Sequence, residues 1–407
     1  MIHMPVPFNN MQNMQFLIGS NDGLSRFSQI SPLEIFSSVV LKFWATVSSQ
    51  LLANPQAKPY PDVVTFAFFC RKAHLLALQK PYAESDMRWG RGVIFHIAPS
   101  NVPVNFAYSL LVGMLAGNAN VIRVSSKDFV QVDLICHAMR EVLENAEFAI
   151  LRERLCVVKY PRSLEVNQVL SALSDVRVIW GGDATIAEVR QAPLSARAFD
   201  VCFADRYSIA VFNAEAVLAH PDMQGLARNF YNDTYLFDQN ACSAPRLLVW
   251  QGDAIHVAAA QEVFWAAVQS QLDNYSIDAV AAIDKLSTLC TYADDPTGVR
   301  LISRSNNKLW RIALERLNSD LTAHRCAAGY FLEYITQDLA DLKGVVNRKY
   351  QTLAYFGFDP KEMKELLLNS RFVGIDRVVP VGKTTDFSLS WDGHDLIYAF
   401  SRVCAVS

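Results

Sequence analysis

The stretch GVIFHIAPSNVPVNFAYSLLVGMLAGNANVIRV, residues 92–124, decides the fold. Its apolar run Val93–Ile97 predicts a buried strand, and the loop Ala98–Pro103 follows it. A helix is expected over Phe106–Ala116, closed by a Gly-Asn pair of the kind that ends helices. A second strand is expected over Asn120–Val124. A strand, a helix and a strand in this order predict a parallel sheet covered on both faces.

The same alternation continues along the chain. Before residue 206 we expect a helix over 128–144, strands over Cys156–Lys159 and Val176–Trp180, and a helix after Gly181-Gly182-Asp183. After Arg206 we expect a strand over Tyr207–Phe212, a helix over 222–231 and a strand over Leu247–Trp250. The fold class predicted is therefore α/β, with two domains built on parallel sheets. Ligands of such sheets bind beyond the carboxyl ends of the strands.

The region before residue 90 is expected to be helical. Ser31-Pro32-Leu33-Glu34 supplies an N-cap, a proline at the first helical position and a capping-box glutamate. Apolar residues spaced over 33–47 fit one helical face. Asp62 is expected to cap a second helix that runs to about Lys80.

Composition excludes several classes of protein. The 407 residues include 37 Lys+Arg and 40 Asp+Glu, a net charge of −3, which disfavours a nucleic-acid-binding protein. With 51% hydrophobic and 19% charged residues, the chain is not intrinsically disordered. Its eight cysteines form no CxxC pair and no Cys/His cluster, so no metal site and no disulfide framework is expected. The N-terminal residues lack the pattern of a secretory signal, and no apolar stretch is long enough to span a bilayer. We expect a cytoplasmic protein.

Two short motifs carry candidate chemistry. The glycines of Gly181-Gly182-Asp183 lie between a strand and a helix, where a phosphate can approach backbone N–H groups, although a tight turn is the commoner role of such a pair. The segment FDQNACSAPR, residues 237–246, places Cys242 among small residues just before a strand. Such a thiol is accessible and is a candidate nucleophile; the alternative is an ordinary buried cysteine.

Several motifs, in order, resemble the LuxC-type acyl-CoA reductases, a branch of the aldehyde dehydrogenase superfamily. The resemblance covers most of the chain from about residue 90. The matching blocks are the opening stretch, VIWGGD (178–183), FDQNACSAPR (237–246), KYQTLAYFG (349–357), GIDRVVPVGKTTDFSLSWDGHDL (374–396) and SRVC (401–404).

The resemblance implies an aldehyde-dehydrogenase-like fold in three parts. These are N-terminal helices with a nucleotide-binding domain (1–206), a catalytic domain (207–370) and a segment that returns to the nucleotide domain or to a subunit interface (371–407). It also implies reduction of a fatty acyl-CoA or similar thioester to an aldehyde, through an acyl-enzyme on Cys242. Asn101 would supply an oxyanion-hole amide together with the backbone N–H of Cys242. The local alternative for Asn101 is a turn residue.

The expected cofactor is NADPH, with NADH as the alternative. Arg123 occupies the position of a superfamily lysine that contacts the adenosine ribose, and a guanidinium there would favour a 2′-phosphate. The other implied cofactor residues are Ser125, Lys127, Gly181, Gly182, Asp183 and, for the nicotinamide ribose, Glu333. His96 matches a family histidine that would act as general acid; the alternative is a hydrogen-bonded core histidine.

The segment Phe203–Ser208 lacks the glutamate with which hydrolytic members activate water, which fits an enzyme that releases aldehyde. Asp205 could substitute for it, although an Asp before an Arg is more often part of a surface ion pair. The family further implies a homo-oligomer and a partner acyl-protein synthetase that supplies acyl groups. Two alternatives stay open: an acyl-phosphate reductase of the glutamyl-phosphate reductase type, and a non-catalytic scaffold in an acyl-transfer complex.

Overall fold

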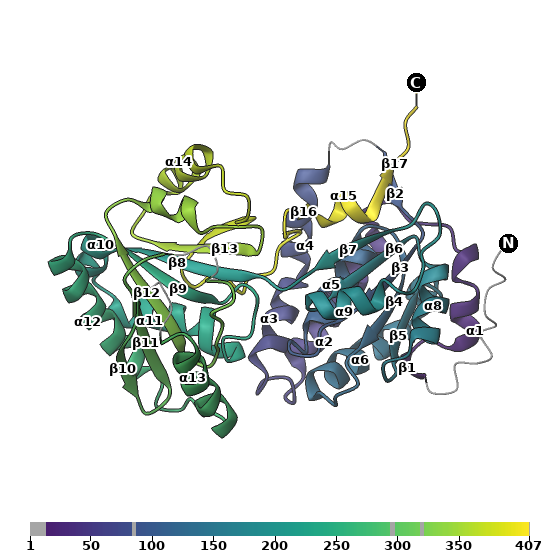
Figure 1. Cartoon of the computed structure of the whole chain (residues 1–407). Helices are drawn as coiled ribbons and strands as arrows, with labels where there is room; N and C mark the ends of the chain where they lie inside the picture. Colours follow the sequence, from purple (N-terminus) through teal and green to yellow (C-terminus); the bar gives the residue numbers. More distant parts are fainter. Residues whose placement is uncertain (1–13, 84–86, 294–297, 318–320, 407) are drawn as a thin grey trace. The chain divides into compact units, whose positions relative to one another are not determined.

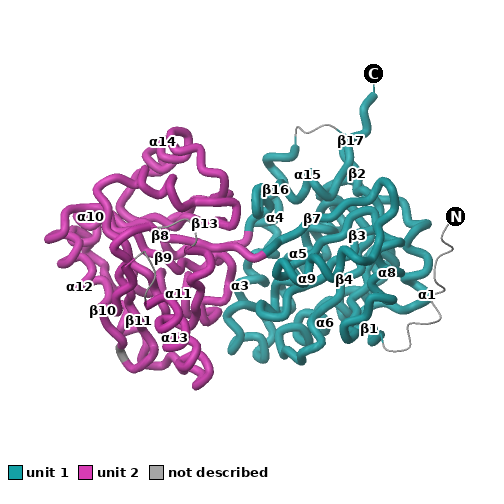
Figure 2. Tube along the Cα trace, viewed as in Figure 1, with its two compact units in different colours: residues 1–204, 388–407 teal, residues 205–387 magenta. Residues whose placement is uncertain are grey.

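The computed structural model describes residues 14–83, 87–293, 298–317 and 321–406. The N-terminal residues 1–13, which bear on the expected lack of a secretory signal, lie outside the described residues. The chain divides into two compact units (Figure 2): unit 1 comprises Met1–Ala204 with Ser388–Ser407, and unit 2 comprises Asp205–Phe387. The first division lies close to the expected boundary after residue 206. Of the expected C-terminal segment 371–407, residues from Ser388 onward belong to unit 1.

Unit 1 is built on a six-stranded sheet with the strand order β1-β5-β4-β3-β6-β7 (Figure 1). The strands are β1 (Gln15–Ile18), β3 (Val93–Ile97), β4 (Ala119–Val124), β5 (Leu155–Lys159), β6 (Val176–Trp180) and β7 (Phe199–Phe203). All neighbouring strands are parallel except β1, which pairs antiparallel with β5. The predicted α/β class and parallel sheets are confirmed.

Helices surround this sheet. They are α1 (Asn21–Ser25), α2 (Ser38–Ala53), α3 (Pro61–Phe69), α4 (Lys72–Gln79), α5 (Asn105–Leu115), α6 (Val130–Leu143), α7 (Ala149–Arg152), α8 (Leu164–Leu173), α9 (Asp183–Val189) and α15 (Leu396–Phe400). Helix α5 contacts β3 and β4 on one side and α2 and α15 on the others. Because it is covered on several sides, almost all of its residues are apolar and buried.

The helix start predicted at Ser31–Glu34 is wrong, since α2 begins at Ser38. The backbone of Leu33 instead accepts a bond from Gly90 N–H (3.0 Å) and donates one to the Gly117 carbonyl (2.8 Å). Tertiary pairing of the backbone thus overrides a local capping signature. The single helix expected over 62–80 is likewise two helices, α3 and α4, and α3 begins at Pro61, one residue before the expected cap.

The C-terminal segment completes unit 1. Strand β17 (Ser401–Val403) pairs antiparallel with β2 (Arg88–Gly90), and a short hairpin of β15 (Ser390–Trp391) and β16 (His394–Asp395) precedes α15. The Asn118 side-chain amide donates to the Phe400 carbonyl (2.9 Å), and Arg91 Nε donates to the Ala399 carbonyl (2.8 Å). Residues separated by 282 and 308 positions are therefore tied together by hydrogen bonds.

Unit 2 contains a seven-stranded sheet with the order β10-β11-β12-β9-β8-β13-β14. The strands are β8 (Tyr207–Asn213), β9 (Pro245–Gln251), β10 (Val299–Ser305), β11 (Leu309–Leu314), β12 (Tyr330–Thr336), β13 (Tyr350–Phe356) and β14 (Arg377–Pro380). Only the pair β10–β11 is antiparallel among these described strands.

Two apolar cores flank the unit 2 sheet. One contains residues of α10 (Ala214–Ala219), α11 (Met223–Thr234) and α12 (Ala254–Ser270), and includes Phe212, Phe230, Trp250 and Phe264. The other includes residues of the 3-10 segment Leu339–Gly344 and of α14 (Pro360–Ser370). Helix α13 (Ala279–Thr291) lies toward β10 and β11 in Figure 1.

No described helix is both long enough and apolar enough to cross a membrane. The eight cysteines are free thiols. Within the described residues, no cluster of three His, Cys, Asp or Glu side chains is placed to hold a metal ion.

Candidate functional site

Three of the predicted motifs meet at the carboxyl edge of the unit 1 sheet. The Asn101 loop follows β3, Arg123 lies near the end of β4, and the Gly181-Gly182 turn follows β6. Strand β3 is hydrogen-bonded to both of the other strands, with Ile97 opposite Arg123 on one side and Ile179 on the other. Motifs far apart in sequence are thus brought to three adjacent strand ends.

The direction in which successive strands are added to the sheet reverses at β3. From β3 the chain moves outward through β4 and β5, and then returns to place β6 on the other side of β3. Such a switch point leaves a crevice between the loops that leave the two strands, and nucleotides bind there in open α/β sheets. The loop 98–104 and the turn at Gly181 flank this point.

Asn101 is exposed in the loop 98–104, which precedes α5. The loop is fixed at both ends: Ala98 N–H donates to the Arg123 carbonyl (3.0 Å), and Asn105 N–H donates to the Val102 carbonyl (3.1 Å). The side chain of Asn101 is therefore presented from an anchored loop rather than from the buried core.

Arg123 is half-buried against Tyr160. Its Nε and Nη2 donate to the Tyr160 carbonyl (3.4 and 3.2 Å), and its guanidinium lies 4.8 Å from the centre of the Tyr160 ring. These contacts hold the stem and orient a permanent positive charge at the strand edge.

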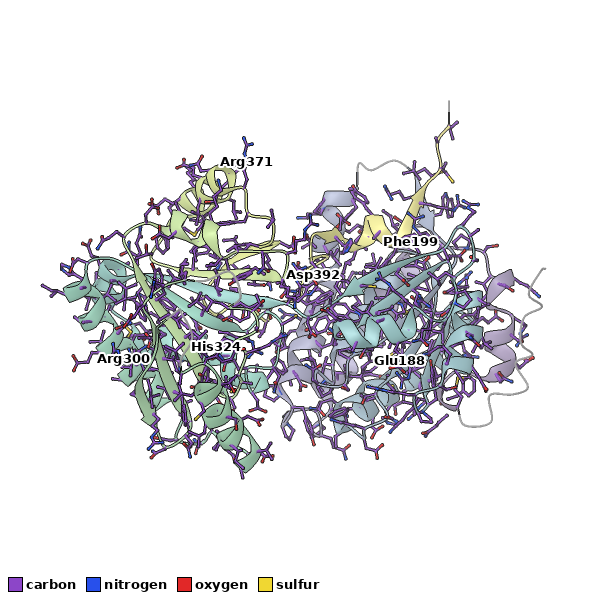
Figure 3. The ribbon with its side chains drawn as sticks, viewed as in Figure 1. Glu188, Phe199, Arg300, His324, Arg371 and Asp392 are labelled. Carbon is purple, nitrogen blue, oxygen red and sulfur yellow. The ribbon has the colours of Figure 1, made fainter. Side chains whose placement is uncertain are left out.

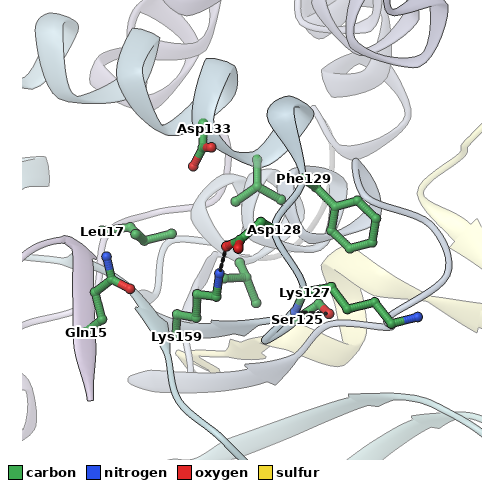
Figure 4. A pocket seen from close by; sticks show the side chains of 10 residues that line it. Gln15, Leu17, Ser125, Lys127, Asp128, Phe129, Asp133 and Lys159 are labelled. Atoms are coloured by element: carbon green, nitrogen blue, oxygen red, sulfur yellow. Dashed lines mark hydrogen bonds and ion pairs between the residues drawn. The ribbon is translucent and has the colours of Figure 1, made fainter. Parts of the chain in front are cut away.

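Ser125 and Lys127 follow β4 and line a small polar pocket of about 80 Å³ (Figure 4). Ser125 Oγ accepts a bond from Lys127 N–H (3.1 Å), which shapes the turn. Asp128 pairs with Lys159 from β5, while the Lys127 side chain extends away from this ion pair. Lys127 is therefore the exposed cation of this turn.

The Gly181-Gly182-Asp183 turn joins β6 directly to α9, with Gly182 as the extended N-cap residue. A Cβ on Gly181 would lie 3.0 Å from the Thr185 side chain, so the turn has little room for a larger residue. Asp183 is exposed in the first helical turn. The helix is short, at seven residues.

His96 is fully buried in a chain of hydrogen bonds. Its Nε2 lies 3.0 Å from Asn120 Oδ1 and its Nδ1 lies 2.8 Å from Ser109 Oγ, which also accepts from Trp180 Nε1 (2.9 Å). Burial lowers the pKa of His96 to about 4, so the imidazole is neutral at pH 7. This arrangement favours the core interpretation of His96 over that of a general acid.

Gly113 of α5 makes room for the His96 network. A Cβ at this position would lie 2.0 Å from Asn120 Oδ1 and 3.0 Å from His96 Nε2. Through Ser109, the network connects β3 and α5 to Trp180, the last residue before the glycine turn. Its role is to fix the sheet edge that carries the motifs.

In unit 2 the predicted nucleophile lies at the amino edge of the sheet, immediately before β9. Cys242 is partly exposed in the loop 238–244. Its backbone carbonyl accepts a bond from Ser208 Oγ (2.7 Å), and this hydroxyl oxygen accepts one from Thr352 N–H (3.2 Å). The start of β8 and the start of β13 thereby hold the cysteine backbone.

The buried side chain of Gln239 fixes the conformation of the loop 238–244. Its Nε2 donates to the carbonyls of Pro245 (3.0 Å) and Tyr330 (3.1 Å), and its Oε1 accepts from Gly329 N–H (3.0 Å) and Tyr330 N–H (3.1 Å). The side chain is 0% exposed, so all four bonds are shielded from water. Asp238 and Gln239 both have positive φ (51° and 59°), a strained pair that this network over-determines.

Arg246 provides a second clamp on the same loop. Its Nη2 donates to the Gln239 carbonyl (2.7 Å), and its Nη1 donates to the Cys326 carbonyl. Burial, followed by the charge of Arg325, lowers the pKa of Arg246 to about 10. A buried positive charge thus lies just beyond the carboxyl end of the loop 238–244.

A loop from the C-terminal block is fastened beside β14. Arg377 donates to the carbonyls of Thr384 (2.7 Å), Lys383 (2.8 Å) and Asp386 (2.5 Å). Asp233 accepts from Gly382 N–H (2.6 Å) and Thr384 N–H (3.0 Å), and its burial raises its pKa to about 6. Arg377 therefore organises a loop.

Glu333 is engaged inside unit 2. Arg311 Nε donates to its Oε1 (2.6 Å), and its Oε2 accepts from the indoles of Trp250 (2.9 Å) and Trp265 (3.0 Å) and from Gln261 (2.8 Å). With Glu333 only 2% exposed, both carboxylate oxygens are satisfied by protein donors. This is the arrangement of a structural ion pair.

Asp205 forms an ion pair with Arg325 (3.6 Å), whereas the neighbouring Arg206 pairs with Asp376. Sequence reasoning missed Ser208, Gln239 and Arg246 as residues that shape the cysteine loop. The DQ dipeptide before the cysteine was the only signal for this group, because the partners of these residues come from distant strands.

Comparisons with known proteins agree with this architecture. Residues 71–405 match the family described as acyl-CoA reductase (LuxC). A long-chain acyl-protein thioester reductase from Aliivibrio fischeri is 23% identical over 322 residues, covering 75% of this chain and 61% of that protein. Its counterpart from Vibrio harveyi is 20% identical over 333 residues, covering 79% and 65%. The chain thus matches somewhat less than two thirds of the length of these relatives.

Among solved structures, aldehyde dehydrogenase 21 from Physcomitrella patens has a TM-score of 0.68 at 12% identity, covering 94% of this chain and 88% of that one. Lactaldehyde dehydrogenase from Escherichia coli has a TM-score of 0.64 at 11% identity (94% and 87%), and an indole-3-acetaldehyde dehydrogenase complexed with NAD⁺ has 0.65 at 15% (94% and 85%). These likenesses establish the aldehyde-dehydrogenase-like fold. Because the family match covers most of the residues, the chain belongs to the LuxC family of acyl-CoA reductases.

Proposed function

We propose that this protein reduces an acyl thioester to the corresponding aldehyde through an acyl-enzyme on Cys242. The observation that carries the proposal is the clamped loop around this partly exposed cysteine, in a chain of the LuxC family. The Cys242 carbonyl is bonded by the Ser208 side chain of β8, and the preceding Gln239 is held by the Arg246 side chain of β9 and by the backbone of Tyr330 at the start of β12. A nucleophile gains from such fixation because the attacking atom is already in position.

The chemistry follows from the thiolate. It attacks the thioester carbonyl, the carbon–sulfur bond to the leaving group breaks, and the acyl group stays on Cys242. When bound, a nicotinamide cofactor supplies the hydride that reduces this acyl group. Collapse of the resulting thiohemiacetal releases the aldehyde and restores the thiolate. We assign to Asn101 the donation of a hydrogen bond to the carbonyl oxygen that gains negative charge.

We assign cofactor binding to the carboxyl edge of the unit 1 sheet. The switch point at β3 and β6, the glycine turn and the fixed guanidinium of Arg123 fit a dinucleotide. The residues assigned are Arg123, Ser125, Lys127, Gly181, Gly182 and Asp183. The cationic Arg123 and Lys127 favour NADPH over NADH. His96 and Glu333 are left out, because their polar atoms are already bonded within the cores.

Acyl-enzyme trapping tests the proposal. The protein is incubated with radiolabelled acyl-CoA and then chased with NADPH or NADH while aldehyde is measured. We expect Cys242→Ala to lose the label and Cys290→Ala, a change at an exposed cysteine of the same unit, to keep it. Equal labelling of wild type and Cys242→Ala would remove the nucleophile assignment.

Further outcomes separate the alternatives. Labelling by acyl phosphates and not by CoA esters would identify an acyl-phosphate reductase. An absence of labelling with intact nucleotide binding would identify a scaffold. We also propose that the protein is a cytoplasmic homo-oligomer that receives acyl groups from an acyl-protein synthetase; the names of the relatives, which specify acyl-protein thioesters, support the second point. Sedimentation velocity and acyl transfer from a purified synthetase test these two statements.

A further inference from the structure

A cavity of about 540 Å³ lies within unit 2 and adjoins the nucleophile loop. Helix α13 forms one wall with Ser287, Thr288 and Thr291, and Asn240 and Arg246 bring the loop itself to the cavity. We call this space the α13 cavity. Its volume is in the range of small-molecule sites, which is about 300–1,000 Å³.

Positive charge gathers around the α13 cavity. Arg246 and Arg325 line it. Lys285, which follows the lining residue Asp284 on α13, is buried and donates from Nζ to the carbonyls of Asn307 and Ala328. In the described part of the chain, no carboxylate lies within ion-pair distance of Arg246 or Lys285. Arg325 pairs with Asp205 at 3.6 Å, and its Nη2 donates to the Arg206 carbonyl (2.6 Å).

The burial of these two cations costs free energy of folding when no ligand is bound. Arg246 is 5% exposed and Lys285 is 0% exposed, and burial lowers the pKa of Lys285 to about 8. Removing a cation from water without a carboxylate partner opposes folding, and an anionic ligand would offset this cost. Only Asp284 adds a negative charge to the lining.

Tyr292, which follows the last residue of α13, adds an aromatic and polar side chain to the lining of the α13 cavity. The His324 ring stacks on Tyr292 with ring centres 4.0 Å apart and planes at 7°, and His324 Nε2 lies 2.9 Å from the Tyr330 hydroxyl. Figure 3 shows His324 inside unit 2. Tyr292 and the α13 hydroxyls thus give the cavity a surface suited to amides and hydroxyls as well as to an anion.

We propose that the α13 cavity binds the phosphopantetheine arm of the thioester substrate, with Arg325 contacting its phosphate. The inference rests on the proposed function and names the part of the substrate that this side of the loop recognises. Phosphopantetheine combines one phosphate with amides and a hydroxyl, and its thioester must reach Cys242. The same arm occurs in CoA and on acyl carrier proteins, and either source fits the cavity chemistry.

The test compares two thioesters that carry one acyl chain and differ only in the phosphate: acyl-phosphopantetheine and acyl-pantetheine. For wild type we expect kcat/KM to be about tenfold or more higher with the phosphate, the usual size of a charged hydrogen bond. Arg325→Gln should lose this preference through KM while keeping its rate with acyl-pantetheine. Asp284→Asn should increase the preference, because it removes the one negative charge from the lining.

Arg300→Gln serves as the matched control, since Arg300 is exposed on the outer strand β10 of the same unit (Figure 3). It should behave as wild type. Equal losses with both thioesters in Arg325→Gln, or a wild type without phosphate preference, would overturn the proposal. Acyl-CoA and an acyl carrier protein, assayed in parallel, then show which source of the arm is used.

Direct titration with free phosphopantetheine separates this inference from the proposed function. If wild type binds phosphopantetheine and Arg325→Gln does not, but no thioester is reduced, the site assignment survives and the proposed reaction fails. If thioesters are reduced and phosphopantetheine binding is the same in both proteins, the reaction survives and the site assignment fails.

Discussion

The side-chain amide of Gln239 pairs with both backbone groups of Tyr330, accepting from its N–H and donating to its carbonyl, each at 3.1 Å. The residue three positions before the proposed nucleophile thus bonds to the first residue of β12 much as a neighbouring strand would. The nucleophile loop is part of the sheet's hydrogen-bond pattern although it is not a strand.

Replacing Gln239 by Ala should therefore destabilise unit 2. The change leaves two N–H and two carbonyl groups buried without their partners, and we expect the free energy of unfolding to fall by about 2–4 kcal/mol. Urea unfolding measures this loss. Gln251→Ala, at the other end of β9 with one exposed bond of 3.3 Å, is the control and should lose less than about 1 kcal/mol. Similar losses in the two variants would contradict the structural role of Gln239.

Asn101→Ala should lower kcat while leaving cofactor affinity within about twofold. An oxyanion-hole donor contributes about 10²–10³ in kcat, because it stabilises charge that develops during the reaction. Steady-state kinetics and a fluorescence titration of the nucleotide check the two expectations. The exposed Asn145→Ala provides a comparison in the same unit. Unchanged turnover in Asn101→Ala would remove this residue from the mechanism.

Arg123→Leu should reduce the preference for NADPH over NADH by about tenfold, because it removes a charge-assisted contact to the 2′-phosphate. The ratio of kcat/KM for the two nucleotides is the measurement. Arg123→Lys keeps the charge without the planar fork and should retain part of the preference. If kcat/KM falls equally with NADPH and NADH, Arg123 stabilises the strand edge through its contacts with Tyr160 and does not bind the 2′-phosphate.

His96 predicts a pH dependence of stability. Its pKa of about 4 in the folded protein lies below the ordinary value of 6.5. Between these two pH values the imidazole is therefore mostly protonated in the unfolded chain and mostly neutral in the folded chain. His96 therefore favours folding fully above pH 6.5, and this contribution is lost as pH falls toward 4. Between pH 7 and pH 5, wild type should lose about 2 kcal/mol more than His96→Gln in urea unfolding. His137→Gln, at an exposed position, should follow wild type. Parallel pH profiles for wild type and His96→Gln would be evidence against a neutral buried imidazole.

Glu333→Gln should weaken the fold and leave the nicotinamide cofactor's KM unchanged. Breaking a buried pair leaves Arg311 without a counter-charge, at a cost of about 3–5 kcal/mol. Glu188, labelled in Figure 3, forms an exposed pair with Arg162 at 3.6 Å, and Glu188→Gln should cost no more than about 1 kcal/mol. A raised KM with unchanged stability would instead support the cofactor role that the family resemblance implies for Glu333.

Local sequence patterns predicted much of the framework. The strands Val93–Ile97 and Val176–Trp180 lie where apolar runs placed them, because buried parallel strands are apolar on both faces. The pattern failed at Leu33, whose backbone pairs with Gly90 and Gly117, and at β1, whose partner β5 is far along the chain. The candidate site residues show the same difference between local patterns and contacts with distant segments. Cys242 was visible in its DQNACS context, but the partners of Glu333 and His96 come from separate strands and helices, and local patterns do not report such contacts.

The pairing of β17 with β2 also has a consequence for how the molecule is made. The ribosome synthesises residues 1–204 and then the whole of unit 2 before it reaches the strand that covers β2 and the carbonyl that accepts from the Asn118 amide. Strand β2 therefore has no β17 partner while unit 2, a continuous insertion in unit 1, is synthesised and folds. Synthesis of residues 388–407 therefore follows that of the whole of unit 2 and supplies the strand that covers this edge of unit 1.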